Sequence, residues 1–158
     1  MTNVYRAVTP WSPDRPETLV VCCSDGRWHA QLTEFVQAEV SDRADLYAVP
    51  GGPAVLDAWN SSFDEARVFE QSMRLFAEYH RISGIWLIAH EGCAWYSLKH
   101  PHLDMPAILK RQVADLRRGK EILLERHPAY DVRLIFAEHD EHGVVFRDCT
   151  HASEVAQA

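Results

Sequence analysis

Two short clusters of reactive side chains stand out in this sequence of 158 residues. The first is Cys23-Ser-Asp-Gly-Arg27 and the second is His90-Glu-Gly-Cys93. Zinc prefers thiolate sulfur and imidazole nitrogen in a tetrahedral arrangement, so Cys23, His90 and Cys93 form a plausible set of three zinc ligands. A catalytic zinc site keeps its fourth position for water. The His-x-x-Cys spacing alone is a weak signal, and the presence of both clusters makes it much stronger.

Asp25 and Arg27 supply a further group with a chemical use. Two thiolates cancel the charge of a zinc ion, which makes the metal a weaker Lewis acid than one held by neutral imidazoles. Its water then loses a proton less readily, and a nearby base such as Asp25 would help. Arg27 can pair with Asp25, keep it ionised and hold it in place. Without that pairing, Asp25 could instead become the fourth ligand and close the site.

Both clusters follow predicted buried strands. Residues 18–23 and 85–89 are continuous apolar runs, typical of strands buried on both faces of a parallel sheet. The remaining predicted elements are strands at residues 45–49, 132–137 and 144–146, the last antiparallel to its neighbour, and helices at residues 28–40, 64–81 and 104–127.

Strands that alternate with helices indicate an α/β fold, with a mostly parallel central sheet of about five strands flanked by helices. We expect an irregular N-terminal arm over residues 1–17, a single α/β domain over residues 18–147 and a tail over residues 148–158. Sites in such sheets gather beyond the carboxyl ends of the strands, where the strand order reverses. If the two strands are neighbours, both clusters share one crevice.

The composition excludes several classes of protein. With 47% hydrophobic residues the chain resembles one soluble globular domain, and its net charge of −7 argues against nucleic acid or an anionic membrane as a partner. No apolar run approaches the roughly 18 residues that cross a bilayer. The start of the chain lacks the apolar segment of a signal peptide. We therefore expect a cytoplasmic protein, whose four cysteines are not paired as disulfides.

At the two clusters the sequence resembles the β-class carbonic anhydrases, whose signatures are Cys-x-Asp-x-Arg and His-x-x-Cys. The signatures correspond here to residues 23–27 and 90–93. The resemblance also covers the strand and glycine turn at residues 45–52 and the helix and strand at residues 70–90, and it runs from about residue 18 to residue 147.

The resemblance implies a site and an activity. Cys23, His90 and Cys93 would bind zinc, and Asp25 and Arg27 would form a dyad beside the bound water. The family catalyses the reversible hydration of carbon dioxide: zinc-bound hydroxide attacks the carbon, bicarbonate leaves and a proton passes to buffer. Because the family is built from dimers that often pair further, the resemblance also implies a homodimer or a higher homo-oligomer that acts on a small molecule.

The sequence departs from the family pattern at three places. Ala94 stands where the family usually has glycine, and Trp95 and Tyr96 follow it. Residues 48–52, Ala-Val-Pro-Gly-Gly, replace an Arg-Asn-Ala-Gly stretch, and the arm over residues 1–17 is short. Two alternatives therefore stay open: a non-catalytic zinc-binding module with a structural or regulatory role on the same fold, and a hydrolase of carbonyl sulfide or carbon disulfide.

The other reactive side chains fit structural roles. Side chains alternate along a strand, so Cys22 should point away from Cys23 and lie in the core. Cys149 follows the last strand and is interpreted as structural or exposed. His139 and His142 are interpreted as parts of a solvated hairpin turn, because no other metal ligand lies near them in the sequence.

Overall fold

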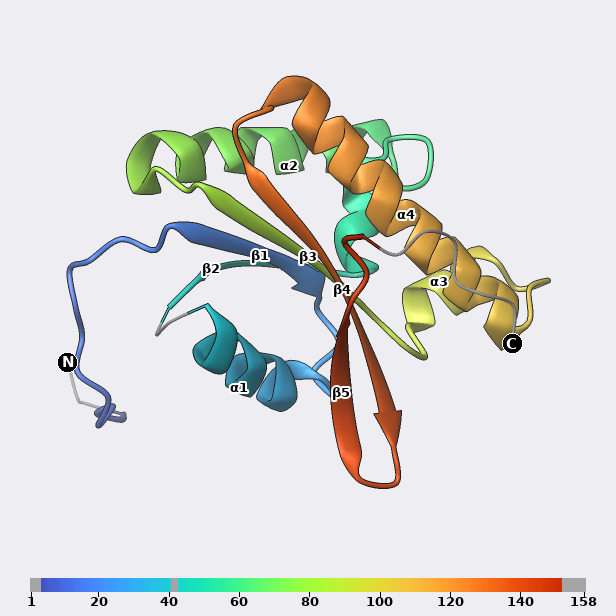
Figure 1. The fold of residues 1–158 in the computed structure, drawn as a ribbon, viewed down its shortest axis with the longest axis horizontal. Coiled ribbons are helices and arrows are strands. Elements are labelled where there is room, and N and C mark those ends of the chain that lie inside the picture. Colours follow the sequence, from blue (N-terminus) through green and yellow to red (C-terminus); the bar gives the residue numbers. More distant parts are fainter. Residues whose placement is uncertain (1–3, 41–42, 152–158) are drawn as a thin grey trace.

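The structure is a computed structural model that describes residues 4–40 and 43–151 (Figure 1). Within these residues five strands form one sheet, in the order β2-β1-β3-β4-β5. The strands are β1 (Thr18–Cys23), β2 (Asp45–Val49), β3 (Gly84–His90), β4 (Asp131–Asp140) and β5 (Gly143–Asp148). Neighbouring strands run parallel except β5, which is antiparallel to β4. The predicted mostly parallel sheet with an antiparallel last strand is confirmed.

The helices cover both faces of this sheet. They are α1 (His29–Glu39), α2 (Phe63–Leu75), α3 (Ala94–Lys99) and α4 (Met105–Arg126). Figure 1 shows α1 on one face, with α2 and α4 on the other. No helix in the described part of the chain is long and apolar enough to cross a membrane.

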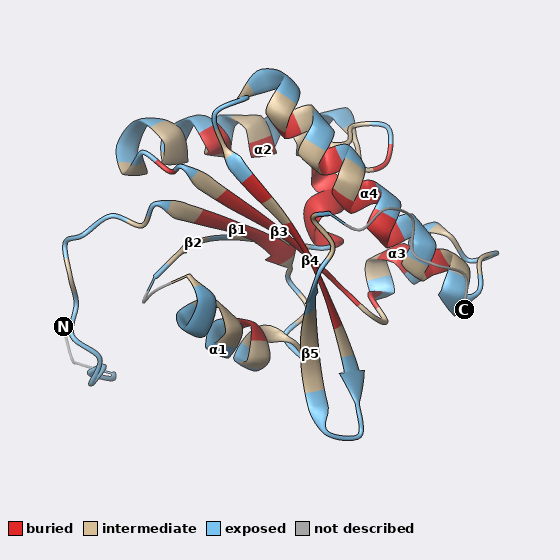
Figure 2. Ribbon diagram, viewed as in Figure 1, coloured by how far each residue is buried: buried red, intermediate tan, exposed pale blue. Residues whose placement is uncertain are grey.

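The alternation of side chains along β1 divides the interior into separate cores. Val20 and Cys22 pack on the face that α1 covers, whereas Leu19 and Val21 belong to the larger core beneath α2 and α4. The buried middle of the sheet is visible in Figure 2. Cys22 is only 2% exposed, and Cys23 packs in a third, smaller core. The prediction that Cys22 is a core residue on the face opposite Cys23 is confirmed.

The helix predicted over residues 64–81 is shorter than expected. Ser62 begins α2, because its hydroxyl accepts a hydrogen bond from the Glu65 backbone N–H at 3.1 Å. The regular helix ends at Leu75, and one π-helical turn follows at Phe76–His80. Arg81 then adopts a left-handed conformation, which turns the chain into β3.

Two short helical segments were not predicted, and both lie near the carboxyl ends of the parallel strands. One is a 3₁₀-helical turn at Gly52–Leu56 and the other is α3. Segments of one or two turns are too short to show a helical period in the sequence. Residues 4–17 contain no helix or strand, and β5 ends at Asp148. Of the expected tail, residues 152–158 lie outside the described residues.

Candidate functional site

The two reactive clusters lie side by side at one edge of the sheet. β1 ends at Cys23 and its parallel neighbour β3 ends at His90. The chain passes from β1 outward to β2 and then returns to the other side of β1 as β3, so the strand order reverses here. This is the crevice in which open α/β sheets bind their ligands.

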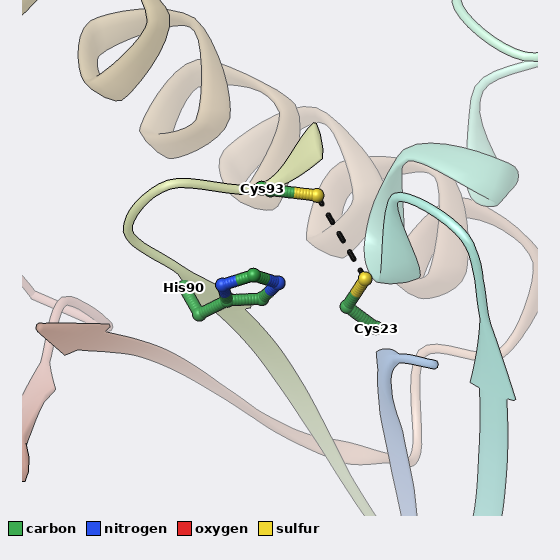
Figure 3. Close-up of side chains that lie close together, drawn as sticks. All are labelled: Cys23, His90 and Cys93. Carbon is green, nitrogen blue, oxygen red and sulfur yellow. Dashed lines mark hydrogen bonds between the residues drawn. The ribbon is translucent and has the colours of Figure 1, made fainter. Parts of the chain in front are cut away.

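Cys23, His90 and Cys93 converge at this edge (Figure 3). One potential ligand atom from each lies within 4.8 Å of those of the other two, and no second group of this kind occurs within residues 4–40 and 43–151. The two sulfur atoms are 3.7 Å apart. Two thiolates bound at about 2.3 Å to a tetrahedral zinc lie roughly 3.8 Å apart. The spacing of the sulfurs therefore fits a shared zinc ion.

The ring of His90 is oriented for metal binding. Its Nδ1 lies 2.7 Å from the backbone oxygen of Glu91. Because a carbonyl can only accept, Nδ1 carries the proton and Nε2 carries the free lone pair. Nε2 is buried and has no hydrogen-bond partner among the described residues. A buried acceptor without a partner is costly, and a metal ion at this position would satisfy it.

The two thiols influence each other's ionisation. A hydrogen bond from Cys93 holds the pKa of Cys23 well below its usual value, while the same bond and burial raise the pKa of Cys93. The backbone N–H groups of Trp95 and Tyr96 oppose this rise in the pKa of Cys93. The short contact between the sulfurs thus favours the thiolate of Cys23 over that of Cys93. A divalent cation favours loss of the Cys93 proton as well, because cysteine binds zinc as the thiolate.

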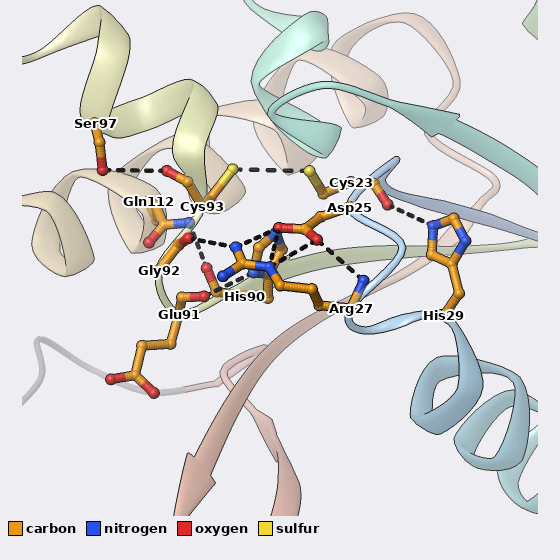
Figure 4. A network of polar contacts seen from close by, with 10 residues as sticks. All are labelled: Cys23, Asp25, Arg27, His29, His90, Glu91, Gly92, Cys93, Ser97 and Gln112. Atoms are coloured by element: carbon orange, nitrogen blue, oxygen red, sulfur yellow. Dashed lines mark hydrogen bonds and ion pairs between the residues drawn. The ribbon is translucent and has the colours of Figure 1, made fainter.

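Arg27 holds Asp25 through a two-pronged ion pair (Figure 4). Nη2 of Arg27 donates to one carboxylate oxygen at 2.6 Å and Nε donates to the other at 3.0 Å. Nη2 also donates to the Gly92 backbone oxygen at 3.1 Å, which ties both residues to the segment between His90 and Cys93. The hydrogen bonds from Arg27 lower the pKa of Asp25 to about 2. Asp25 is therefore an ionised carboxylate beside the converging ligands and is not one of that group.

The predicted hairpin histidines do not join the site as ligands. His139 lies in β4, not in the turn, and its Nδ1 is 2.9 Å from a carboxylate oxygen of Glu91. His142 lies in the turn, with its side chain 83% exposed. Neither belongs to the metal-ligating group found in the described part of the chain. Cys149 is partly buried against the larger core, in agreement with a structural role.

Two glycines bring the loop after β2 against the site. Gly51 and Gly52 both have positive φ, at 78° and 53°. A Cβ on Gly52 would lie 2.8 Å from the backbone nitrogen of Cys23, and one on Gly51 would lie 2.6 Å from the indole of Trp95. The Pro-Gly-Gly-Pro sequence predicts a tight turn, but the close approach to Cys23 depends on the fold.

An apolar cavity of about 280 Å³ flanks the same edge. It is lined by Tyr47, Val49, Pro50, Val55, Ser61, Asp64, Glu65, Val68 and Trp95. Val49 pairs with Cys23 in the sheet, and Trp95 lies two residues beyond Cys93. Val49, Pro50 and Trp95 therefore make this wall of the site region apolar.

Two buried polar residues of α4 also reach the site region and were not anticipated from the sequence. Gln112 and Asp115 are 2% and 6% exposed. Their signal was available: they lie on the face of the helix that also carries Ile108, Leu116 and Gly119, where only apolar residues would be expected.

No protein-family model matches this chain, and no curated protein sequence matches it. Solved structures do. A β-carbonic anhydrase of the fungal pathogen Aspergillus fumigatus is 12% identical, with a TM-score of 0.56 over 89% of this chain and 78% of that one. A tetrameric β-carbonic anhydrase of the ascomycete Sordaria macrospora is 12% identical, with a TM-score of 0.54 over 88% and 84%. A β-carbonic anhydrase of Trichomonas vaginalis is 12% identical, with a TM-score of 0.52 over 92% and 90%.

The chain therefore has the β-carbonic anhydrase fold. The resemblance based on two short motifs is confirmed at the level of the fold, and a Cys-His-Cys group that could bind a metal lies at the carboxyl edge of its sheet.

Proposed function

We propose that this protein is a zinc-dependent carbonic anhydrase that reversibly hydrates carbon dioxide to bicarbonate. One observation carries the proposal: on this fold, two sulfurs 3.7 Å apart converge with the unpartnered ring nitrogen of His90. Their donor types and spacing fit zinc.

Each residue of the site would have a separate task. Cys23, His90 and Cys93 would hold the zinc ion, which when bound would supply an activated water as the nucleophile. Asp25 would accept a hydrogen bond from that water and orient it. Arg27 keeps Asp25 ionised and binds both of its carboxylate oxygens, which would leave the fourth position to the water.

The surroundings suit a small uncharged substrate. Carbon dioxide is linear and carries no net charge, and the cavity beside the site is lined mainly by apolar side chains, among them Val49, Val55 and Trp95. These apolar side chains can contact a substrate that carries no charged group. Carbonyl sulfide and carbon disulfide share this shape, so the assay must include them.

The test combines metal analysis with a hydration assay on the same sample, purified without chelators. We expect one zinc per chain and stopped-flow hydration of carbon dioxide that disappears in Cys93→Ser. One zinc without hydration would contradict the proposed activity and favour a non-catalytic zinc module. Sulfide release that exceeds hydration would indicate a hydrolase of carbonyl sulfide or carbon disulfide. Absence of zinc would contradict the metal centre itself.

We also propose that the protein is a homo-oligomer. The similar protein of Sordaria macrospora is tetrameric, which supports this. The surface of this chain supports it too, because four large apolar residues of the N-terminal arm, Val4, Tyr5, Val8 and Trp11, are each at least 81% exposed.

A further inference from the structure

Helix α4 carries two polar side chains on the face that packs into the protein. Gln112 and Asp115 are three residues apart, so they lie on the same side of the helix. Buried polar groups need hydrogen-bond partners. The partners of Gln112 and Asp115 therefore show which parts of the chain this face of α4 binds. Each of the two has a partner in the segment from His90 to Tyr96, which contains His90 and Cys93.

Gln112 binds the beginning of that segment. Its Nε2 donates a hydrogen bond of 2.8 Å to the backbone oxygen of His90, the last residue of β3 (Figure 4). His90 leaves the sheet at this point, and its ring is bonded to the backbone oxygen of the next residue, Glu91. The amide of Gln112 therefore fixes the peptide group from which the His90 ring projects.

Asp115 binds the far end of the same segment. Its carboxylate accepts a hydrogen bond of 2.8 Å from the hydroxyl of Tyr96, a residue of α3 that is 2% exposed. It also accepts from Asn60 at 2.6 Å and from Nε of Arg111 at 3.1 Å. Three donors thus hold this carboxylate in one orientation, and the carboxylate in turn fixes Tyr96.

The position of Tyr96 matters for Cys93. Cys93 and Tyr96 pack together in the same small buried core, so a shift of α3 would change the packing around Cys93. Cys93 lies directly before this helix, and its own backbone oxygen accepts from the N–H of Ser97 at 3.3 Å. The hydrogen bond between Asp115 and Tyr96 thereby fixes the helix that begins directly after Cys93.

We infer that Gln112, and Asp115 through Tyr96, are positioning residues that fix the segment from His90 to Cys93 at both ends in the geometry for metal binding. The inference rests on the proposed metal centre and deepens it. It assigns to side chains of α4 the role of hydrogen-bonding partners that orient the ligands.

Cobalt binding tests the inference without relying on activity. In Tyr96→Phe and Gln112→Met, which keep side-chain volume but lose one donor each, we expect Co²⁺ affinity to fall by roughly 10- to 100-fold. We also expect a changed thiolate-to-cobalt absorption band. The affinity is measured by competition with a chelator of known strength. Gln112→Leu replaces Gln112→Met if the latter does not fold, since leucine also lacks the donor.

A matched control separates positioning from simple loss of stability. Leu123 lies on α4 in the larger core, away from the site, so Leu123→Ala should lower the melting temperature yet leave cobalt affinity and spectrum unchanged. Unchanged affinity and spectrum in Tyr96→Phe and in the Gln112 variant would overturn the inference. So would an equal loss of affinity in Leu123→Ala.

The same samples distinguish failure of the inference from failure of the proposed function. Wild-type protein that binds cobalt and responds to the substitutions, but does not hydrate carbon dioxide, would support the inference and contradict the function. Wild-type protein that binds neither cobalt nor zinc would contradict both.

Discussion

At the scale of single residues, the structure favours one of the two roles that a carboxylate near a metal can take. Asp25 could bind the ion or act on a bound water, and the sequence left both open. In the structure Arg27 donates hydrogen bonds to both carboxylate oxygens of Asp25. It also donates to the Gly92 backbone oxygen, which fixes its position. Such a paired carboxylate is suited to orient a water and less suited to replace it.

The first prediction concerns Asp25→Asn. Asparagine retains the shape but loses the charge that accepts from the nucleophilic water. We expect zinc content to stay at one per chain and kcat to fall by about 100-fold or more, as is typical for loss of a general base. Stopped-flow hydration and metal analysis of the same sample provide the two measurements.

A matched control is available on the surface. Glu121 forms an ion pair of 3.1 Å with Arg118 and its side chain is 62% exposed, so Glu121→Gln removes a similar pair away from the ligands and from the cavity. It should leave hydration unchanged. Full turnover in Asp25→Asn would show that the role assigned to Asp25 is wrong.

The second prediction concerns pH. With a pKa of about 2, Asp25 is ionised from mildly acidic to alkaline pH, so the hydration rate should rise toward alkaline pH with deprotonation of the nucleophilic water alone. Because its folded pKa lies below the ordinary 3.8, the stabilisation from Asp25 is present above about pH 4 and is lost as the pH falls toward 2.

Two measurements check the predicted pH dependence of the hydration rate and of stability. The difference in the free energy of unfolding between the wild type and Asp25→Asn should be constant from about pH 5 to neutral, and should shrink as the pH falls below 4. A hydration rate that stays flat from neutral to alkaline pH, or a stability difference that grows in acid, would contradict the assignment.

At the scale of elements, the loop after β2 determines how closely the backbone approaches Cys23. Gly52 allows this approach in two ways, because its φ is 53° and its α-carbon faces the backbone of Cys23. Gly92 has a similar φ of 65° but open space around the position of a Cβ. Gly52 and Gly92 therefore have a similar backbone conformation but differ in the space available for a side chain.

The third prediction compares alanine substitutions at these two glycines. Gly92→Ala should cost about 1 to 2 kcal/mol, the strain of a left-handed residue with a side chain. Gly52→Ala should cost about 2 to 4 kcal/mol, since overpacking against Cys23 adds to the same strain. Urea denaturation of both variants measures the difference, and equal losses would contradict the close approach.

Elements with long apolar runs could be predicted from the sequence, whereas features that depend on contacts between distant parts of the fold could not. The strands at 18–23 and 85–89 could be predicted because burial on both faces requires continuous apolar residues. The convergence of Cys23 with Cys93 then followed from the general placement of sites in parallel sheets. In contrast, α3 was too short to show a period, and the tie from Gln112 to His90 joins residues whose proximity only the packed fold determines.

At the scale of the whole molecule, one sheet brings together ligands that are far apart along the chain. α1 on one face and α2 and α4 on the other leave the carboxyl edge of the strands to the candidate metal centre (Figure 1). The four exposed apolar residues of the N-terminal arm lie outside the cores of this domain. A single chain thus has a complete set of three candidate ligands and an apolar surface without a partner in the described structure.

The fourth prediction follows from that surface. Light scattering coupled to size-exclusion chromatography should give a mass at least twice the 18.1 kDa of one chain. Truncation of residues 1–16 should shift the mass toward that of one chain, because it removes the exposed apolar residues and leaves β1 intact. A single species of 18.1 kDa for the full chain would contradict the proposed homo-oligomer.

X-ray absorption at the zinc edge of the protein as purified tests the metal centre most directly. We expect one zinc per chain, with two sulfur neighbours at about 2.3 Å and lighter nitrogen or oxygen neighbours at about 2.0 to 2.1 Å. A zinc shell without sulfur, or protein that retains no zinc, would contradict the assignment of Cys23, His90 and Cys93 as its ligands.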